Sequence, residues 1–292
     1  MLYTIENNKL RVEISDLGAE LMSVKTKSDG CEYLWQGDAT YWAGRACNLF
    51  PICGRLTERR YTYKGQTYEM NSHGFLRHAL TAVTAQSDTA ISFTLTDTEE
   101  LRKQYPFAFE ITVTYTLEGD TIHHNFTVKN PADETLIFAV GGHPGFNVPL
   151  CEGETFEDYY VEFGCEKEAK KVVMSDTCFD TGHRELFPLK EGKILRLHHE
   201  LFDNDAIFLV DMCKRVTLKS TKCKKTVTLT YPDMNALGFW HKPQSDAPYI
   251  CIEPWTSLPA YDKQVDDLAA KQWMIHLEGG KEYTNTFDIT IA

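Results

Sequence analysis

Hydrophobic residues alternate with polar ones through much of this chain, and this period of two is typical of β-strands with one buried face. Every second residue is hydrophobic over 111–117 and again over 122–128, and Glu118-Gly119-Asp120 separates the two runs. Acidic residues around a glycine favour a turn, so this stretch predicts a β-hairpin. Similar patterns predict further strands at 12–24, 90–96, 159–163, 216–218, 227–229 and 287–291. We therefore expect an all-β, mainly antiparallel fold, either a large β-sandwich or a barrel.

Helix-forming segments are rare. Residues 98–105 begin with Thr98, which can cap a helix, continue with two glutamates and stop before Pro106, so one or two helical turns are expected there. Residues 219–225 are polar and lysine-rich and are expected to form a hairpin tip. No linker, change of composition or fixed-period repeat divides the 292 residues, and we expect one domain over 1–292.

The charge balance limits the partners of this chain. Lysine and arginine total 30 against 42 acidic residues, a formal net charge of −12. Nucleic acids and anionic membranes need a basic surface, so neither is expected as a partner. No apolar run has the length of a membrane span, and the first residues lack a secretory signal.

Cysteine usage indicates a reducing compartment. The nine cysteines are odd in number and include no Cys-x-x-Cys pair, and a chain of this length does not need a disulfide framework. We therefore expect reduced thiols and a cytoplasmic location. The oligomeric state is left open between a monomer and a homodimer.

Two histidines lie in short patches rich in glycine. His73 precedes Gly74, which would allow the backbone to approach a ligand closely. His143 lies between Gly142 and Pro144-Gly145, shortly after the apolar strand 136–138, and is expected at a strand end. Structural turns could explain both patches, but a titratable imidazole at such a position also suits proton transfer.

A carboxylate and an arginine occupy two further patches. Glu253 follows the apolar run 249–252, is expected at the end of that buried strand, and precedes Pro254-Trp255. Burial would raise the pKa of this carboxylate toward the working range of a general base, while the structural alternative is a buried salt bridge. Arg55 follows Gly54, and its guanidinium could hold vicinal hydroxyls or form a structural ion pair.

The remaining candidates fit a small, neutral ligand. Asp205 opens an apolar strand, and Trp240 is one of four tryptophans that could stack on a sugar. His73 and His78 are five apart in a non-helical stretch, which disfavours a metal pair. The chain has no Gly-x-Gly-x-x-Gly, Walker or Gly-x-Ser-x-Gly motif. We therefore predict no metal, no cofactor and a sugar as the leading candidate for the ligand.

Taken in order, the patches Phe50–Arg55, His73–Arg77, Gly142–Phe146 and Ile252–Trp255 resemble the aldose 1-epimerase (galactose mutarotase-like) family, especially its LacX-like bacterial branch. The resemblance covers nearly the whole chain and implies an antiparallel β-supersandwich with a sugar site in a cleft over one sheet. Better-known galactose mutarotases have Asn-His-Ser-Tyr-Phe-Asn-Leu where this chain has Gly-His-Pro-Gly-Phe-Asn. The preferred sugar is therefore left open.

The resemblance also implies roles for the candidate residues. His143 matches the general acid that protonates the sugar ring oxygen, and Glu253 matches the general base that accepts the proton of the anomeric hydroxyl. His73 matches a second histidine that contacts the sugar near its ring oxygen. Arg55 matches a substrate-binding arginine. The hydroxyl-binding aspartate is placed at Asp205, with residue 203 as the other possible register.

The implied activity is interconversion of the α and β anomers of a hexose without a cofactor, with Arg77 and Trp240 among the substrate-binding residues. A hexose-6-phosphate 1-epimerase is the nearest alternative, with Arg59, Arg60 or Arg77 holding the phosphate. A non-catalytic sugar-binding or regulatory protein could have the same pocket. A glycoside hydrolase would need a second, suitably spaced carboxylate.

Overall fold

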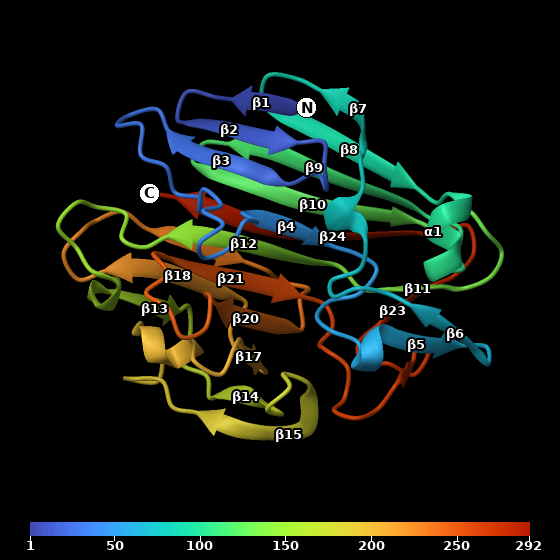
Figure 1. The fold of residues 1–292 in the computed structure, drawn as a ribbon. Helices are drawn as coiled ribbons and strands as arrows, with labels where there is room; N and C mark the ends of the chain where they lie inside the picture. Colours follow the sequence, from blue (N-terminus) through green and yellow to red (C-terminus); the bar gives the residue numbers. More distant parts are fainter.

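The computed structural model describes residues 1–292, and its strands form two large sheets and three small ones (Figure 1). The nine-stranded sheet has the order β16 (Ile194–Arg196), β13 (Tyr159–Phe163), β18 (Arg215–Ser220), β19 (Val227–Thr230), β24 (Glu282–Ile291), β10 (Thr121–Lys129), β9 (Glu110–Glu118), β8 (Ala90–Thr96) and β7 (Ala82–Gln86). The seven-stranded sheet has the order β15 (Asp180–Phe187), β14 (Ala169–Met174), β17 (Ile207–Val210), β20 (Ala236–Trp240), β21 (Tyr249–Trp255), β12 (Gly141–Asn147) and β4 (Ala46–Leu49). Nearly all strand pairs are antiparallel, so the predicted fold class is confirmed.

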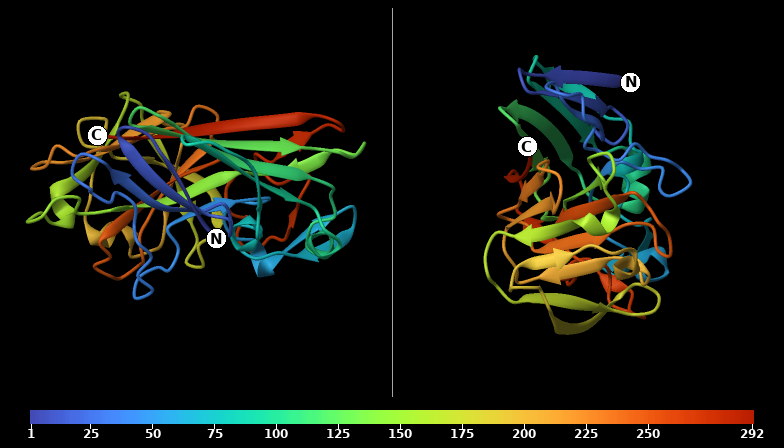
Figure 2. Two further views of the ribbon diagram at one scale, coloured as in Figure 1. Left: turned by 90° about the horizontal axis from the view of Figure 1, so that it is seen from above. Right: turned by 90° about the vertical axis from the view of Figure 1, so that its left-hand side faces the viewer.

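The small sheets lie beside the large ones. They contain β1 (Leu2–Glu6), β2 (Leu10–Ser15) and β3 (Leu21–Thr26); β11 (Leu136–Phe138) and β23 (Ile275–Leu277); and β22 (Asp266–Asp267), β5 (Arg60–Tyr63) and β6 (Gln66–Glu69). In Figures 1 and 2 the sheet of β1–β3 lies beside β7 and β8, and the Glu6 amide donates to the Asp88 carbonyl at 2.6 Å. This contact attaches the N-terminal sheet to the edge of the nine-stranded one.

Helical structure is confined to short segments. The single α-helix is α1 (Glu99–Gln104), and four 3-10 segments are η1 (Thr57–Arg59), η2 (Leu76–His78), η3 (Phe156–Asp158) and η4 (His199–Phe202). The predicted cap is present, since the Thr98 hydroxyl accepts from the Leu101 amide at 3.2 Å. No helix has the length and apolar character needed to cross a membrane.

Most of the predicted strands are present. The predicted hairpin is formed by β9 and β10, and the predictions at 90–96 and 159–163 match β8 and β13. The segment 12–24 instead divides into β2 and β3, because Gly18 and Ala19 have positive φ angles of 69° and 50° and turn the chain.

The two large sheets pack face to face over a shared hydrophobic core. Gly142 of β12 lies so close to β24 that a Cβ there would come within 2.5 Å of the Phe287 ring. Phe239 of β20 lies with its ring centroid 6.2 Å from that of Phe163 of β13. Because successive side chains in a strand point to opposite faces, residues 141, 143 and 145 must face away from this core. The outer face of the seven-stranded sheet is therefore free to carry a site.

Four of the nine cysteines are paired, so the expectation of reduced thiols throughout is wrong. Cys151 bonds to Cys223 and Cys165 bonds to Cys213, with Cα–Cα distances of 6.4 and 5.9 Å. The pairs join segments 72 and 48 residues apart in the chain. Such proximity arises from strand order, which the spacing of cysteines in the sequence does not reveal.

His124 of β10 is a buried histidine within the core. Its ring lies among Tyr115, Phe126 and Phe287 at centroid distances of 4.5, 4.7 and 4.3 Å. Neither ring nitrogen makes a hydrogen bond. Burial alone lowers the pKa of His124 from 6.5 to about 3, because the charged imidazolium would lose its hydration.

This lowered pKa predicts that His124 destabilises the fold in acid. The unfolded chain binds a proton at this residue below pH 6.5, whereas the folded protein does so only near pH 3. Stability is therefore lost as the pH falls through that window. In urea unfolding, His124→Phe is expected to reduce the loss of unfolding free energy between pH 7 and pH 5 by about 2 kcal/mol. The exposed His183→Phe serves as control, and an identical pH dependence in wild-type protein and His124→Phe would contradict this role.

Candidate active site

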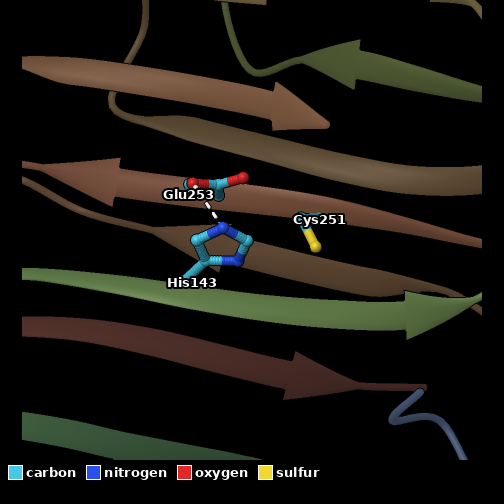
Figure 3. A group of neighbouring side chains, drawn as sticks. All are labelled: His143, Cys251 and Glu253. Carbon is cyan, nitrogen blue, oxygen red and sulfur yellow. Dashed lines mark ion pairs between the residues drawn. The ribbon is translucent and has the colours of Figure 1, made fainter. Parts of the chain in front are cut away.

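His143 and Glu253 face each other across two neighbouring strands. β12 and β21 pair in antiparallel register, with Gly141 opposite Trp255 and Gly145 opposite Cys251, so residue 143 lies opposite residue 253. Nε2 of His143 lies 3.3 Å from a carboxylate oxygen of Glu253 (Figure 3). Both side chains are nearly inaccessible, with exposed fractions of 10% and 2%. Two groups separated by 110 positions in the sequence therefore form one acid–base pair.

The expected strand-end positions of these two residues are wrong. His143 lies inside β12, and Glu253 lies inside β21. The glycines beside His143 serve close packing rather than a turn. A Cβ at Gly141 would lie 2.7 Å from the Trp255 ring, and one at Gly145 would lie 3.1 Å from the Trp42 ring. Glycine in a strand often marks such close approach.

A cleft of about 280 Å³ opens above this pair. It includes all seven residues predicted from the sequence, whereas Asp203, Arg59 and Arg60 lie outside it. Its lining residues are Trp42, Gly54, Arg55, His73, Arg77, His143, Met174, Cys178, Asn204, Asp205, Ala206, Phe208, Trp240, Glu253, Trp255 and Pro259. The mixture of aromatic surfaces and a few convergent polar groups is typical of small-molecule sites.

Aromatic rings hold the His143 imidazole in place. The Trp42 ring lies 4.9 Å from it and the Trp240 ring 5.7 Å, measured between centroids. Burial, together with the nearby charge of Arg77, lowers the pKa of His143 to about 3. The imidazole is therefore neutral at physiological pH.

The pKa of Glu253 is shifted in the opposite direction to that of His143. Burial, with a further contribution from the negative charge of Asp205, raises the pKa of this carboxyl well above its usual value. The two shifts favour a neutral imidazole beside a protonated carboxyl over a separated ion pair. Oε1 of Glu253 is buried without a hydrogen-bond partner, which adds to the cost of ionising this carboxyl.

His73 is oriented by the loop that carries Gly54. The Gly54 amide donates to Nδ1 of His73 at 3.2 Å, and the His73 amide donates to the Gly54 carbonyl at 2.8 Å. Because Nδ1 accepts a hydrogen bond, the ring proton of neutral His73 is assigned to Nε2. The ring lies 5.5 Å from that of His143 and 5.4 Å from that of Trp255. His73 can thus donate a hydrogen bond within the cleft.

Two arginines differ in their pairing. Arg55 donates to Asp205 at 2.6 Å, and this ion pair stands at the open side of the cleft. Arg77 also lines the cleft, and its Nε is buried without a hydrogen-bond partner. Its positive charge helps to lower the pKa of His143 and opposes the rise in the pKa of Glu253. Arg77 is therefore close to the acid–base pair and has capacity for another contact.

Several lining residues were not identified from the sequence. Met174, Cys178 and Phe208 belong to β14, the following loop and β17, and none occurs in a recognisable motif. Phe208 packs on Trp255 with a centroid distance of 4.7 Å. Only the order of strands in the sheet brings these segments to the cleft, and a single sequence carries little signal for it.

A cysteine lies beside the acid–base pair, but it is a poor metal ligand in this setting. Possible ligand atoms of His143, Cys251 and Glu253 all lie within 4.8 Å of one another (Figure 3). Burial holds the pKa of the Cys251 thiol well above its usual value. Metal binding requires the thiolate, which this environment disfavours. We therefore propose no metal for this group.

Three comparisons with known proteins bear on this site. The family model described as aldose 1-epimerase matches residues 1–290. The chain is 34% identical over 302 residues to the chromosomal LacX protein of Lactococcus lactis subsp. lactis, covering 100% of this chain and 99% of the relative. A galactose mutarotase related enzyme from Lactobacillus acidophilus shares 40% identity with a TM-score of 0.95, covering 100% of this chain and 97% of that one. A galactose mutarotase-like protein from Lactobacillus casei shares 32% identity with a TM-score of 0.95, and both chains are fully covered.

Gly74 provides a test of how tightly the loop of His73 is packed. It has a φ of +71°, and a Cβ there would lie 2.2 Å from the Phe50 carbonyl oxygen. Gly65 has a similar φ of +76° with open space around it. Gly65→Ala is expected to cost about 1–2 kcal/mol from backbone strain alone. Gly74→Ala should cost about 1–3 kcal/mol more because of the clash. Equal unfolding free energies of the two variants in urea would show that the Gly74 contact is dispensable.

Proposed function

The chain belongs to the aldose 1-epimerase family, and on that basis we propose that it interconverts the α and β anomers of a reducing hexose by general acid–base catalysis. The main support is the position of Nε2 of His143, 3.3 Å from the Glu253 carboxylate on the floor of a cleft that fits a small ligand. The cleft supplies a proton donor and a proton acceptor, as ring opening at an anomeric carbon requires.

The short distance within the pair suits this reaction. The hydroxyl oxygen O1 and the ring oxygen O5 are bonded to the same carbon, so the acid and the base must reach neighbouring atoms. Glu253 removes the O1 proton while His143 donates a proton to O5, and the C1–O5 bond breaks to give the open aldehyde. Rotation about C1–C2 exposes the other carbonyl face, and reversal of the two transfers closes the opposite anomer.

The protonation states that burial favours for His143 and Glu253 match one side of this cycle. Neutral His143 beside protonated Glu253 is the state that follows ring opening and precedes closure. Ring opening starts from the opposite arrangement, imidazolium and carboxylate, which differs only by transfer of one proton within the pair. Sugar hydroxyls that hydrogen-bond to Glu253 would favour its ionised form. The pair is thus suited to passing one proton in each direction.

The other polar residues hold the sugar in this scheme. The Nε2 proton of His73 is directed to the region of the ring oxygen. Arg55 and Asp205 bind hydroxyls away from C1, and Trp240 provides an apolar surface for the sugar ring. This placement lets binding energy orient the anomeric carbon over the acid–base pair.

A phosphorylated hexose is the second candidate, and one observation favours it. Of the three arginines considered for a phosphate, Arg77 alone lines the cleft, and its Nε lacks a partner. Arg59 instead donates to Asn71 at 2.7 Å, and Arg60 pairs with Glu58. Of these three arginines, Arg77 is therefore the one positioned to hold a phosphate in the cleft.

Removing the base tests the proposed reaction. Glu253→Gln keeps the shape of the side chain but cannot accept the O1 proton, so the rate of anomer exchange should fall by about 10²–10⁴-fold. Polarimetry on a freshly dissolved pure anomer measures this rate after the spontaneous reaction is subtracted. Sugar binding, measured by calorimetry, should persist. Glu100→Gln on the exposed α1 is the control.

The result also separates a catalyst from a binding protein. Full activity in Glu253→Gln would reject Glu253 as the base. Sugar binding by the wild-type protein without any acceleration of anomer exchange would instead favour a non-catalytic role.

Comparison of phosphorylated and free sugars tests the second candidate. We expect kcat/KM for glucose or galactose to exceed that for the corresponding 6-phosphate. The same polarimetric assay on Arg77→Met and on the control Arg60→Met locates any phosphate contact. A 6-phosphate that reacts about tenfold faster than the free sugar, with this preference lost in Arg77→Met alone, would overturn the choice of a neutral hexose.

A further inference from the structure

The cleft continues beyond the residues assigned to one hexose. A wider outer groove of about 1000 Å³ adjoins the inner cleft of about 280 Å³. Seven residues line both: Arg55, Met174, Cys178, Asn204, Asp205, Ala206 and Trp240. His73, Arg77, His143 and Glu253 line the inner cleft alone. The acid–base pair is therefore at the inner end, and the Arg55–Asp205 ion pair marks the boundary with the outer groove.

The position of the acid–base pair at the inner end of the cleft determines which end of a bound sugar lies next to the outer groove. When C1 lies over His143 and Glu253, the hydroxyls remote from C1 point toward Arg55 and Asp205. A substituent on one of those hydroxyls would extend directly into the outer groove. The volume of the inner cleft lies just below the range usual for ligand sites, about 300–1,000 Å³, so it accommodates little more than one sugar ring.

The outer groove has an apolar surface suited to a second ring. Its wall is formed by β14, β15 and the segments around η4, which lie together at the lower edge in Figure 1. Phe187 and Trp240 provide aromatic faces, and Met174 and Leu201 add aliphatic surface. All four are only partly buried, so their surfaces are available to a ligand. Aromatic faces with polar groups at the rim are typical of sites for ligands that have both apolar and hydroxylated surfaces.

The charges of the groove favour a neutral occupant. Arg55 pairs with Asp205 at 2.6 Å, Lys171 with Glu185 at 3.2 Å and His198 with Glu200 at 3.0 Å. Each basic side chain of the groove thus already faces a carboxylate. Asp176 and Asp203 add further acidic groups to the lining. An anionic substituent would be repelled, whereas a neutral sugar would meet no like charge.

We propose that the substrate class is a reducing disaccharide or longer oligosaccharide, with its reducing-end sugar in the inner cleft and the next sugar in the outer groove. This inference rests on the proposed anomer exchange and specifies its substrate. The chemistry at C1 is unchanged, and no glycosidic bond is formed or broken. The second sugar contributes binding energy that helps to position the reacting carbon.

Single-anomer crystals of lactose, maltose and cellobiose provide the test, with glucose and galactose for comparison. In the polarimetric assay, kcat/KM of at least one disaccharide should exceed that of both monosaccharides by about tenfold, the range of a good apolar contact. Phe187→Ala should remove this advantage, while kcat/KM for the monosaccharides should stay within about twofold of that of the wild-type protein. Phe187→Tyr, which keeps an aromatic face, should retain the preference.

Leu186→Ala is the matched control, since Leu186 adjoins Phe187 on β15, is 63% exposed and does not line the groove. The Leu186→Ala variant should have the same kcat/KM as the wild-type protein for every sugar tested. If Phe187→Ala does not fold, the inference is tested by the ratio of kcat/KM for the disaccharides to kcat/KM for the monosaccharides in the wild-type protein. Monosaccharides that react as well as all disaccharides would overturn this inference but leave anomer exchange intact. If the protein accelerates anomer exchange of none of these sugars, both this inference and the proposed function are overturned.

Discussion

The contact between His143 and Glu253 across two strands is the feature on which the rest of the site depends. It exists because β12 and β21 pair in one particular antiparallel register. A shift of one residue would turn one partner into the core between the two large sheets, because side chains alternate between the faces of a strand. Gly142 helps to prevent such a shift, since its missing side chain is what allows the Phe287 ring to approach. Packing of the core thus sets the distance between the proposed acid and base.

Burial gives this pair its chemical character. Both residues are almost fully buried, and the low polarity that lowers the pKa of His143 also raises that of Glu253. In water the imidazole, with a pKa of about 6.5, would bind a proton more strongly than the carboxylate, with a pKa of about 4.3. In the cleft the order of their proton affinities is reversed, so that the carboxyl rather than the imidazole holds the proton. Environments that shift the pKa values of two neighbouring groups in opposite directions are typical of acid–base sites.

The sequence revealed much of the fold because the signal for it is local. Alternating hydrophobicity identified β8, β9, β10 and β13 closely, and Thr98 marked the start of α1. The polar residues of the site were also predictable, because an ionisable group beside glycine or proline in an apolar stretch is unusual. Beyond the hairpin of β9 and β10, strand order and the pairing of distant strands were not predictable, since they depend on contacts between residues far apart in the chain. For that reason His143 was expected at a strand end, and the contributions of Met174, Cys178 and Phe208 to the cleft were missed, as were the two cysteine pairs.

A crystal structure of the protein with a bound reducing hexose tests the proposed chemistry most directly. The predicted complex has C1 at the inner end of the cleft, with the ring oxygen within hydrogen-bonding distance of Nε2 of His143 and O1 within hydrogen-bonding distance of Glu253. The hydroxyls farthest from C1 would face Arg55 and Asp205. A sugar bound in the reverse direction, with C1 toward the outer groove and neither oxygen near the acid–base pair, would contradict the proposed mechanism.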